Sequence, residues 1–172
     1  MQTAKTLKIS FLTGIFVLAI TLLSLSVVKN AIAADIEPIS VIPLHHQQDP
    51  QKVALGQLLF NDARLSKNNA VACASCHQIL QGGDDGLMTS ITNTGDADII
   101  NAPTVFNARY NFRQTWRGKF RTLELQAEGD LQNKRHGNIS WQELILKLKK
   151  IEDYDNKFGE IYRAGISRES IL

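Results

Sequence analysis

Cys73-Ala74-Ser75-Cys76-His77 is the stretch of this sequence whose residue types and spacing specify chemistry most directly. It holds both cysteines of the chain, and a histidine follows the second. On one turn of helix, side chains at i and i+3 lie on the same face, so both sulfurs could form thioethers with the vinyl groups of one porphyrin. His77 would then bind the iron from one side. This is the attachment signature of a c-type haem, and the sequence predicts one covalent haem per chain.

Three other sites could contain the same two cysteines. A structural zinc site needs about four ligands, and the sequence offers no second Cys pair or spaced Cys/His pair. A thioredoxin-type redox pair would follow a strand of a βαβ unit, a pattern that we do not find. A disulfide across two residues would close a very short loop and stabilise the fold little. Covalent haem is the interpretation that agrees with the N-terminal segment.

Residues 1–33 have the pattern of an export signal. Two lysines precede an apolar run from Ile9 to Val28, and Ala31-Ile32-Ala33 offers a small-x-small cleavage site. The run, about 20 residues long, could also span a bilayer, so an uncleaved N-terminal anchor is the alternative. Either version predicts that residues 34–172 work in the periplasm, where bacteria attach c-type haem.

The charge balance gives no support for a negatively charged partner. The whole chain has 19 basic and 17 acidic residues. The export segment contains Lys5, Lys8 and Lys29 and no acid, so 16 basic and 17 acidic residues remain. A net charge of about −1 gives no reason to expect nucleic acid or anionic lipid as a partner. The remaining length of about 139 residues suits one domain with a single core.

Helical patterns lie on both sides of the attachment motif. Asp49 is expected to cap a helix that has Pro50 at its first position. The buried face of this helix is predicted to hold Val53, Leu55, Leu58, Leu59 and Phe60. A second helix is expected from Thr122 to about Glu128, followed by a polar connection over residues 129–138.

A capping box, Ser140-Trp141-Gln142-Glu143, opens the strongest helical pattern of the chain. Its apolar stripe is predicted to hold Trp141, Leu144, Ile145, Leu148 and Ile151. Ser167 starts another helical pattern, and the chain stops at Leu172 inside it. We interpret this ending as a truncation that exposes an apolar face, which predicts self-association or binding to another chain.

Two irregular segments carry candidate iron ligands. An extended arm from Ala34 to Gln48 contains His45 and His46, which are ordinarily solvated at such a place. A long Gly- and Asp-rich loop runs from Leu80 to Asn101 and contains Met88. Met88 could be a sixth iron ligand, as in an electron-transfer haem, or it could fill a gap in the core.

The ordered motifs of the chain resemble those of the N-terminal haem domain of bacterial di-haem cytochrome c peroxidases. The resemblance runs from about Ile36 to the C-terminus, through DPQKVALGQLLFNDARLSKNNAVACASCH, GGDDG, NAPTVFNARYN and LELQAEG. It implies an all-α, c-type cytochrome fold and the reduction of hydrogen peroxide with electrons from a small donor such as a cytochrome c. Members of the family have a second haem domain, and no second Cys-x-x-Cys-His is present here.

The resemblance also assigns roles to single residues. Cys73 and Cys76 match the covalent attachment, and His77 matches the proximal ligand of the peroxidatic haem. Asn101 matches an asparagine that helps to hold calcium between the two domains, and Gln126 matches a distal-pocket glutamine.

Three positions depart from the family pattern. Trp116 matches a tryptophan between the haems, but the family's Trp-Asp-Gly-Arg reads Trp-Arg-Gly-Lys here, so core packing is the alternative role. Asn93 stands where relatives have a loop histidine that ligates the resting iron. His136 stands where they have a distal acid. His136 could replace that acid as the proton-transfer group, bind the iron itself, or be an exposed loop residue.

We therefore expect a periplasmic cytochrome c peroxidase-like haem protein. A mono-haem electron carrier, with its iron closed by Met88 or a histidine, is the alternative. A third alternative is a fragment without activity, because it lacks the electron-supplying domain.

Overall fold

The computed structural model describes residues 41–43 and 47–172. The predictions for the export segment and for His45 and His46 therefore lie outside the described residues. The regular elements belong to one compact unit, residues 45–172. The described part of the chain has no β-strand, only isolated bridges, and the predicted all-α class is confirmed. Across the same residues, no helix is long and apolar enough to cross a membrane.

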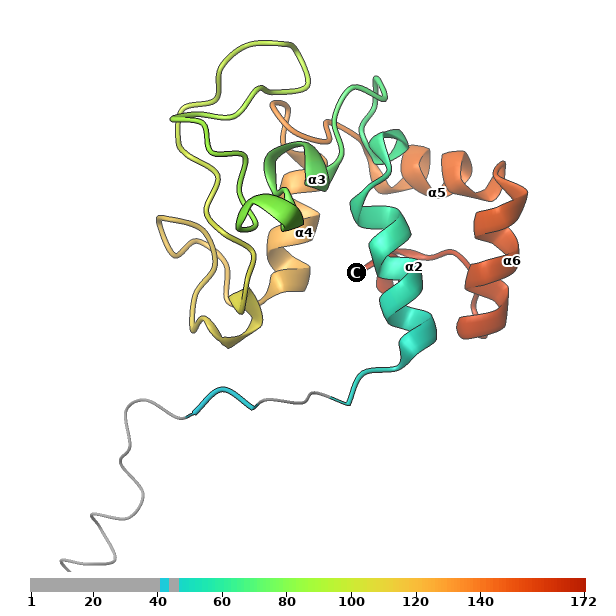
Figure 1. Ribbon diagram of the computed structural model, residues 1–172. Coiled ribbons are helices and arrows are strands. Elements are labelled where there is room, and N and C mark those ends of the chain that lie inside the picture. Colours follow the sequence, from blue (N-terminus) through green and yellow to red (C-terminus); the bar gives the residue numbers. More distant parts are fainter. Residues whose placement is uncertain (1–40, 44–46) are drawn as a thin grey trace, which may run out of the picture. The chain divides into compact units, whose positions relative to one another are not determined.

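The helices follow one another along the chain with a long irregular segment between α3 and α4 (Figure 1). Their bounds are α2 (Pro50–Phe60), α3 (Cys73–Cys76), α4 (Leu123–Gln132), α5 (Trp141–Lys149), α6 (Glu152–Ile161) and α7 (Arg168–Ile171). Short 3₁₀ turns lie at Ala63–Leu65, Ile79–Gln81 and Ala108–Tyr110.

The predicted helix starts are confirmed by the bonds that cap them. The Asp49 carboxylate accepts a hydrogen bond from the Gln51 amide at 2.9 Å. The capping box of α5 is complete, because the Glu143 amide donates to Ser140 Oγ and the Glu143 carboxylate accepts from the Ser140 amide. Such bonds satisfy amides that have no partner inside the helix.

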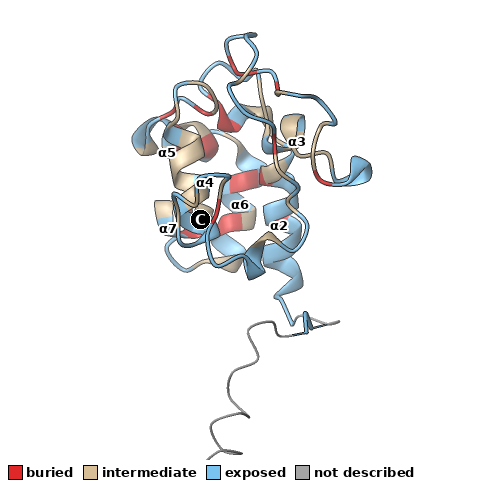
Figure 2. Cartoon of the chain, turned by 90° about the vertical axis from the view of Figure 1, so that its left-hand side faces the viewer, coloured by how far each residue is buried: buried red, intermediate tan, exposed pale blue. Residues whose placement is uncertain are grey.

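The core lies between α2, α5 and α6, which carry the buried red bands visible in Figure 2. Leu148 and Phe158 are completely buried, and Leu144 is 1% exposed. The predicted apolar stripe of α5 is thus confirmed at its centre, and its other members are half-buried. Nine buried side chains form this cluster: Leu55, Leu59, Leu65, Ile139, Leu144, Leu148, Tyr154, Phe158 and Ile166.

Two expectations about the helices were wrong. The buried face of α2 is a narrow stripe of Leu55 and Leu59, while Val53 and Leu58 are exposed, because α2 packs on α6 along one line. The connection expected from residue 129 begins only after Gln132, because α4 continues through Gly129. A Cβ at Gly129 would collide with the Phe120 ring, so a larger residue here would displace that ring.

Helix α6 was not predicted from the sequence. It buries Tyr154 and Phe158, which lie one turn apart, against α5 and α2. The Tyr154 hydroxyl donates to Asp62 Oδ2 at 2.7 Å, which ties α6 to the turn after α2. Helix α6 therefore completes the helical core together with α2 and α5.

Candidate functional site

Helix α3 is a single turn that holds the two cysteines at i and i+3. Both thiols are free in the structure. The protein atoms around the thiol raise the pKa of Cys73 to about 11, with a contribution from the Asp130 carboxylate, although the residue keeps an exposed surface. Burial likewise raises the pKa of Cys76. Catalytic redox cysteines have lowered pKa values, so these thiols do not suit a thioredoxin-type pair.

His77 follows α3, and its ring is held by the loop that succeeds it. Nδ1 lies 3.3 Å from the Gly83 carbonyl oxygen, which fixes the ring so that Nε2 remains for a metal. The same carbonyl accepts the Val105 amide, and the Gly83 amide donates to Gln78. These backbone bonds fix the Gly83 carbonyl in place beside the imidazole of His77.

Gly83 is a position that only glycine suits. Its φ is +83°, and a Cβ there would lie 2.8 Å from Thr104 Oγ1 and 3.1 Å from the Val105 amide nitrogen. The left-handed conformation and the close backbone approach both disfavour a side chain. Two free thiols on one turn, and an imidazole with one nitrogen already engaged, fit the donor set of a c-type haem.

Helix α4 brings the predicted distal glutamine to the predicted distal histidine through a residue that the sequence analysis missed. Gln126 Nε2 lies 3.4 Å from Asp130 Oδ2, one turn further along α4. His136 Nδ1 lies 3.2 Å from Asp130 Oδ1. The Asp130 carboxylate also contributes to the raised pKa of Cys73 on α3.

His136 is held from its other side by Asp98. Nε2 lies 2.9 Å from Asp98 Oδ2, and Arg135 Nε donates to Asp98 Oδ1 at 2.9 Å. The bond to Asp130, and then the bond to Asp98, hold the pKa of His136 above its ordinary value against the effect of burial. Burial acts to raise the pKa of Asp98, but its bonds from His136, Ile99 and Arg135 lower it overall.

Both ring nitrogens of His136 therefore face carboxylates. Neither nitrogen is left for iron in this arrangement, so the prediction that His136 could be the sixth ligand has no support from the structure. Its interpretation as an exposed loop residue holds only in part, because the side chain lies in a turn and is 37% exposed but has two acidic partners.

Asn93 is buried where the loop of residues 90–98 meets the segment that carries His136. Its amide donates to the Arg135 carbonyl at 2.9 Å, and its carbonyl accepts from Asn68 Nδ2 at 2.7 Å. Its side-chain Oδ1 is buried without a hydrogen-bond partner. An amide in this position has no basic nitrogen to offer an iron.

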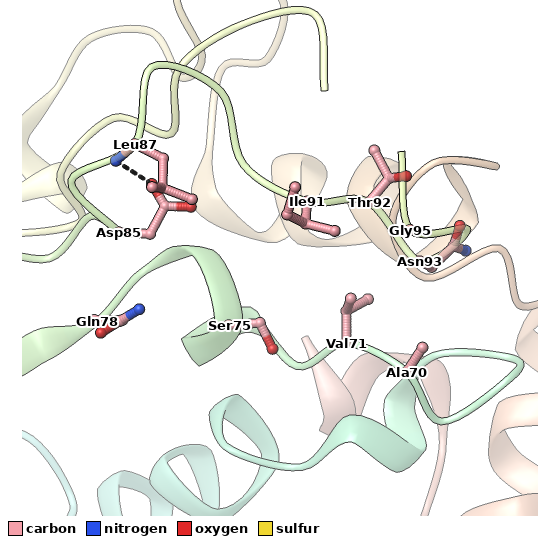
Figure 3. Close-up of a pocket in the computed structure, with 10 residues that line it drawn as sticks. All are labelled: Ala70, Val71, Ser75, Gln78, Asp85, Leu87, Ile91, Thr92, Asn93 and Gly95. Atoms are coloured by element: carbon pink, nitrogen blue, oxygen red, sulfur yellow. Dashed lines mark hydrogen bonds between the residues drawn. The ribbon is translucent and has the colours of Figure 1, made fainter. Parts of the chain in front are cut away.

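A cavity of about 520 Å³ opens beside α3, between the chain around Val71 and Ser75 and the loop that contains Asn93 (Figure 3). The side chains that line it include Gln78, Asp85, Leu87, Ile91 and Thr92. The attachment residues Cys73, Cys76 and His77 are not among them. The cavity therefore lies next to the attachment face and not on it.

The remaining candidates are not gathered at this site. Met88 is 89% exposed, so its interpretation as a filler of the core was wrong. Trp116 is 65% exposed, which also contradicts core packing, and its Nε1 donates to the Asn101 carbonyl at 2.9 Å. Asn101 Nδ2 donates to the Leu87 carbonyl. The described residues contain no group of three or more His, Cys, Asp or Glu placed to hold a metal ion, and calcium at Asn101 stays a prediction.

Asp98 and Asp130 are the site residues that sequence reasoning missed. Asp130 lies four residues after Gln126, and i,i+4 side chains share a helix face. A predicted helix that continued beyond Glu128 would have placed Asp130 on the same face as Gln126. Asp98 is 38 residues from His136, and no local pattern connects them.

Comparison with known proteins identifies a family. Residues 50–172 match the model of the di-haem cytochrome c peroxidase family. The chain is 44% identical to the cytochrome c peroxidase Ccp of Escherichia coli over 136 residues, which is 78% of this chain and 29% of that protein. It is 34% identical to a cytochrome c551 peroxidase of Nitrosomonas europaea over 150 residues, which is 84% of this chain and 45% of that protein.

A solved structure shares the fold. A MauG-like protein associated with microbial copper homeostasis superposes with a TM-score of 0.67 and is 28% identical, over 80% of this chain and 43% of that one. The predicted c-type cytochrome fold is thereby confirmed. The chain spans less than half the length of each of these proteins.

Proposed function

The chain belongs to the di-haem cytochrome c peroxidase family, and from this membership we propose that it reduces hydrogen peroxide to water in the periplasm. Its electrons would come from a small donor protein of the cytochrome c type. One haem per chain is part of the proposal, because the sequence contains a single Cys-x-x-Cys-His.

The main structural support for this proposal is the contact between His77 Nδ1 and the Gly83 carbonyl. The Gly83 carbonyl occupies Nδ1, so the imidazole can bind iron only through Nε2. Cys73 and Cys76 would hold the porphyrin through thioethers. Haem bound here would supply an iron for peroxide and a path for electrons.

The residues of α4 and of the segment after it would form the distal side. Gln126 can donate a hydrogen bond to a bound peroxide, and the carboxylates around His136 keep a proton available there. Asn93 offers no strong ligand to close the iron, so we propose that peroxide binds without prior activation by a second haem.

The alternative of a mono-haem electron carrier requires a sixth protein ligand. Met88 is almost fully exposed, and His136 has both nitrogens engaged. Neither observation favours an iron with a sixth ligand from the protein. The peroxidase is therefore the function that we retain.

The test combines spectroscopy of the ferric holoprotein with turnover. We expect a high-spin or water-bound spectrum that peroxide changes within the mixing time, and consumption of peroxide with a reduced cytochrome c as donor. A purely low-spin spectrum that peroxide does not alter would exclude the peroxidase and favour the carrier. Pyridine haemochrome analysis should give one covalent haem per chain, and light scattering would test the predicted self-association.

A further inference from the structure

Residues 109–121, which we call the basic loop, concentrate positive charge on the surface. The basic loop contains no acidic residue, and all five of its basic residues are exposed: Arg109, Arg113, Arg117, Lys119 and Arg121. The rest of residues 34–172 holds 11 basic and 17 acidic residues. The nearly neutral charge of this part of the chain therefore hides a positive loop and a negative remainder.

The charges of the basic loop are not neutralised inside the described part of the chain. None of the five basic side chains forms an ion pair with a described residue. The guanidinium groups of Arg113, Arg117 and Arg121 make no hydrogen bond to a described residue either. A guanidinium is a planar fork of donors that can bind a carboxylate through two bonds. These three groups are therefore available to carboxylates of another molecule.

Exposed aromatic rings lie between these cations. Phe112 is 92% exposed, and Trp116 is exposed as well. Four of the five basic residues of the basic loop are arginines. Protein–protein interfaces are enriched in aromatic residues and arginine and depleted in lysine. The basic loop forms no amphipathic helix of the kind that lies on a membrane. Its composition and structure are therefore typical of a surface that contacts another protein.

Hydrogen bonds hold the basic loop in one conformation. Gln114 is buried; its amide donates to the Phe120 carbonyl and its Nε2 to the Ala108 carbonyl, both at 2.9 Å. The bond from Trp116 Nε1 to the Asn101 carbonyl holds the indole ring in place. A surface that is ordered in advance loses less entropy when a partner binds. A ring that is held to the backbone also suits a protein surface better than insertion into lipid.

The basic loop is joined to the haem-attachment region by the segment that follows Asn101. Asn101 accepts the bond from Trp116, and four residues later the Val105 amide donates to the Gly83 carbonyl at 3.2 Å. The same carbonyl contacts His77 Nδ1. In Figure 1 the basic loop is the yellow segment that leads into α4. A protein bound to it would contact the part of the chain that supports the predicted iron ligand.

Resting on the proposed function, we propose that the basic loop is the docking surface for the electron donor, and that this donor is a small protein with an acidic surface. Arg117 stands where the family motif Trp-Asp-Gly-Arg has its aspartate, so the excess of positive charge is a property of this chain. The negative remainder of the chain repels an acidic donor and directs it to the basic loop. Each encounter delivers one electron, and two encounters with two protons from solvent reduce one peroxide to two waters.

The test measures binding to the holoprotein without any redox step. The probe is a ferric mono-haem cytochrome c with an acidic surface, and a biosensor records its association and dissociation rates. We expect Arg113→Gln/Arg117→Gln/Arg121→Gln to lower the association rate by about 10- to 100-fold at low ionic strength. The difference should shrink above about 0.1 M salt, where the Debye length is about 10 Å. Phe112→Ser should raise the dissociation rate by roughly 10-fold and change association little.

Lys149→Gln/Lys150→Gln/Arg163→Gln is the matched control, because it removes the same number of charges from exposed positions outside the basic loop. It should leave the association rate within about threefold of the wild type. Equal losses in the two triple variants would overturn the docking surface, since overall charge would explain them. Equally tight binding of a cytochrome c with a basic surface would also overturn it. So would wild-type protein that binds phosphatidylglycerol vesicles and not the acidic probe.

Peroxide consumption, measured with the same cytochrome in its reduced form, separates this inference from the proposed function. Loop-dependent binding of the acidic probe by a protein that never consumes peroxide would support the docking surface and refute the peroxidase. Peroxide consumption that is equally fast in the wild type and the loop variant, with equal binding of the probe, would overturn the docking surface and leave the peroxidase intact.

Discussion

Replacing Gly83 by alanine should destabilise the holoprotein through two separable costs. A Cβ at φ +83° costs about 1–2 kcal/mol for an L-residue in the left-handed region. The contacts at 2.8 Å to Thr104 Oγ1 and 3.1 Å to the Val105 amide nitrogen force the neighbouring chain to move. Such overpacking adds about 1–3 kcal/mol, so we expect a total loss of about 2–5 kcal/mol.

Gly95→Ala is the matched control, because Gly95 has φ +88° and a Cβ placed there would meet no atom within 4 Å. It should lose only the conformational part, about 1–2 kcal/mol. In thermal unfolding this corresponds to a fall in Tm of roughly 3–6 °C for Gly95→Ala and roughly 6–15 °C for Gly83→Ala.

The Gly83 variant should also weaken the bond from His77 Nδ1 to the Gly83 carbonyl. A less basic imidazole stabilises ferric iron less, so the reduction potential should rise in Gly83→Ala and stay constant in Gly95→Ala. Equal losses of Tm in the two variants would refute the close approach at Gly83. An unchanged potential would refute the contact between the Gly83 carbonyl and His77 Nδ1.

Three further outcomes are expected from the helical core. The bonds from Arg64 lower the pKa of Asp62 to about 2. The ionised carboxylate therefore adds about 2 kcal/mol to the free energy of unfolding above pH 4, and this contribution is lost as the pH falls towards 2. In chemical denaturation, Asp62→Asn should abolish this pH dependence. Lys147→Met removes a 2.7 Å bond to a buried backbone carbonyl, and urea titration should show a loss of about 1 kcal/mol. Arg168→Ala breaks two bonds to Glu128, and the resulting fall in Tm should shrink as salt is added.

Local chemistry explains which parts of the fold were predictable. The starts of α2, α4 and α5 depend on a side chain and an amide two or three residues apart, so Asp49, Thr122 and Ser140 could be identified from the sequence. Helix α6 lacks such a cap, because Ile151 stands at its N-cap position. Its residues are nevertheless amphipathic at helical spacing, so the apolar periodicity alone could have revealed the helix.

In the candidate site, too, only the residues that depend on chain neighbours could be predicted. Cys73, Cys76 and His77 could be predicted because thioether attachment and ligation require neighbours in the chain. Asp98 lies 38 residues from His136, and its approach depends on how a long loop folds. Asp130 lies only six residues away, on α4, where a local pattern could have revealed it. Residue types indicated chemistry at His136, but its contact with Asp98 follows only from the tertiary structure.

The position of the core sets an expectation for the order in which the protein folds and takes up haem. The nine side chains of the buried cluster come from residues 55–65 and 139–166, and the attachment motif lies in the long segment between them. The apoprotein can therefore collapse around Phe158 while Cys73 and Cys76 stay open to the haem-attachment machinery. Covalent haem would then order the intervening loops last, so apoprotein should show slow hydrogen exchange in α5 and α6 and fast exchange from residue 78 to 121.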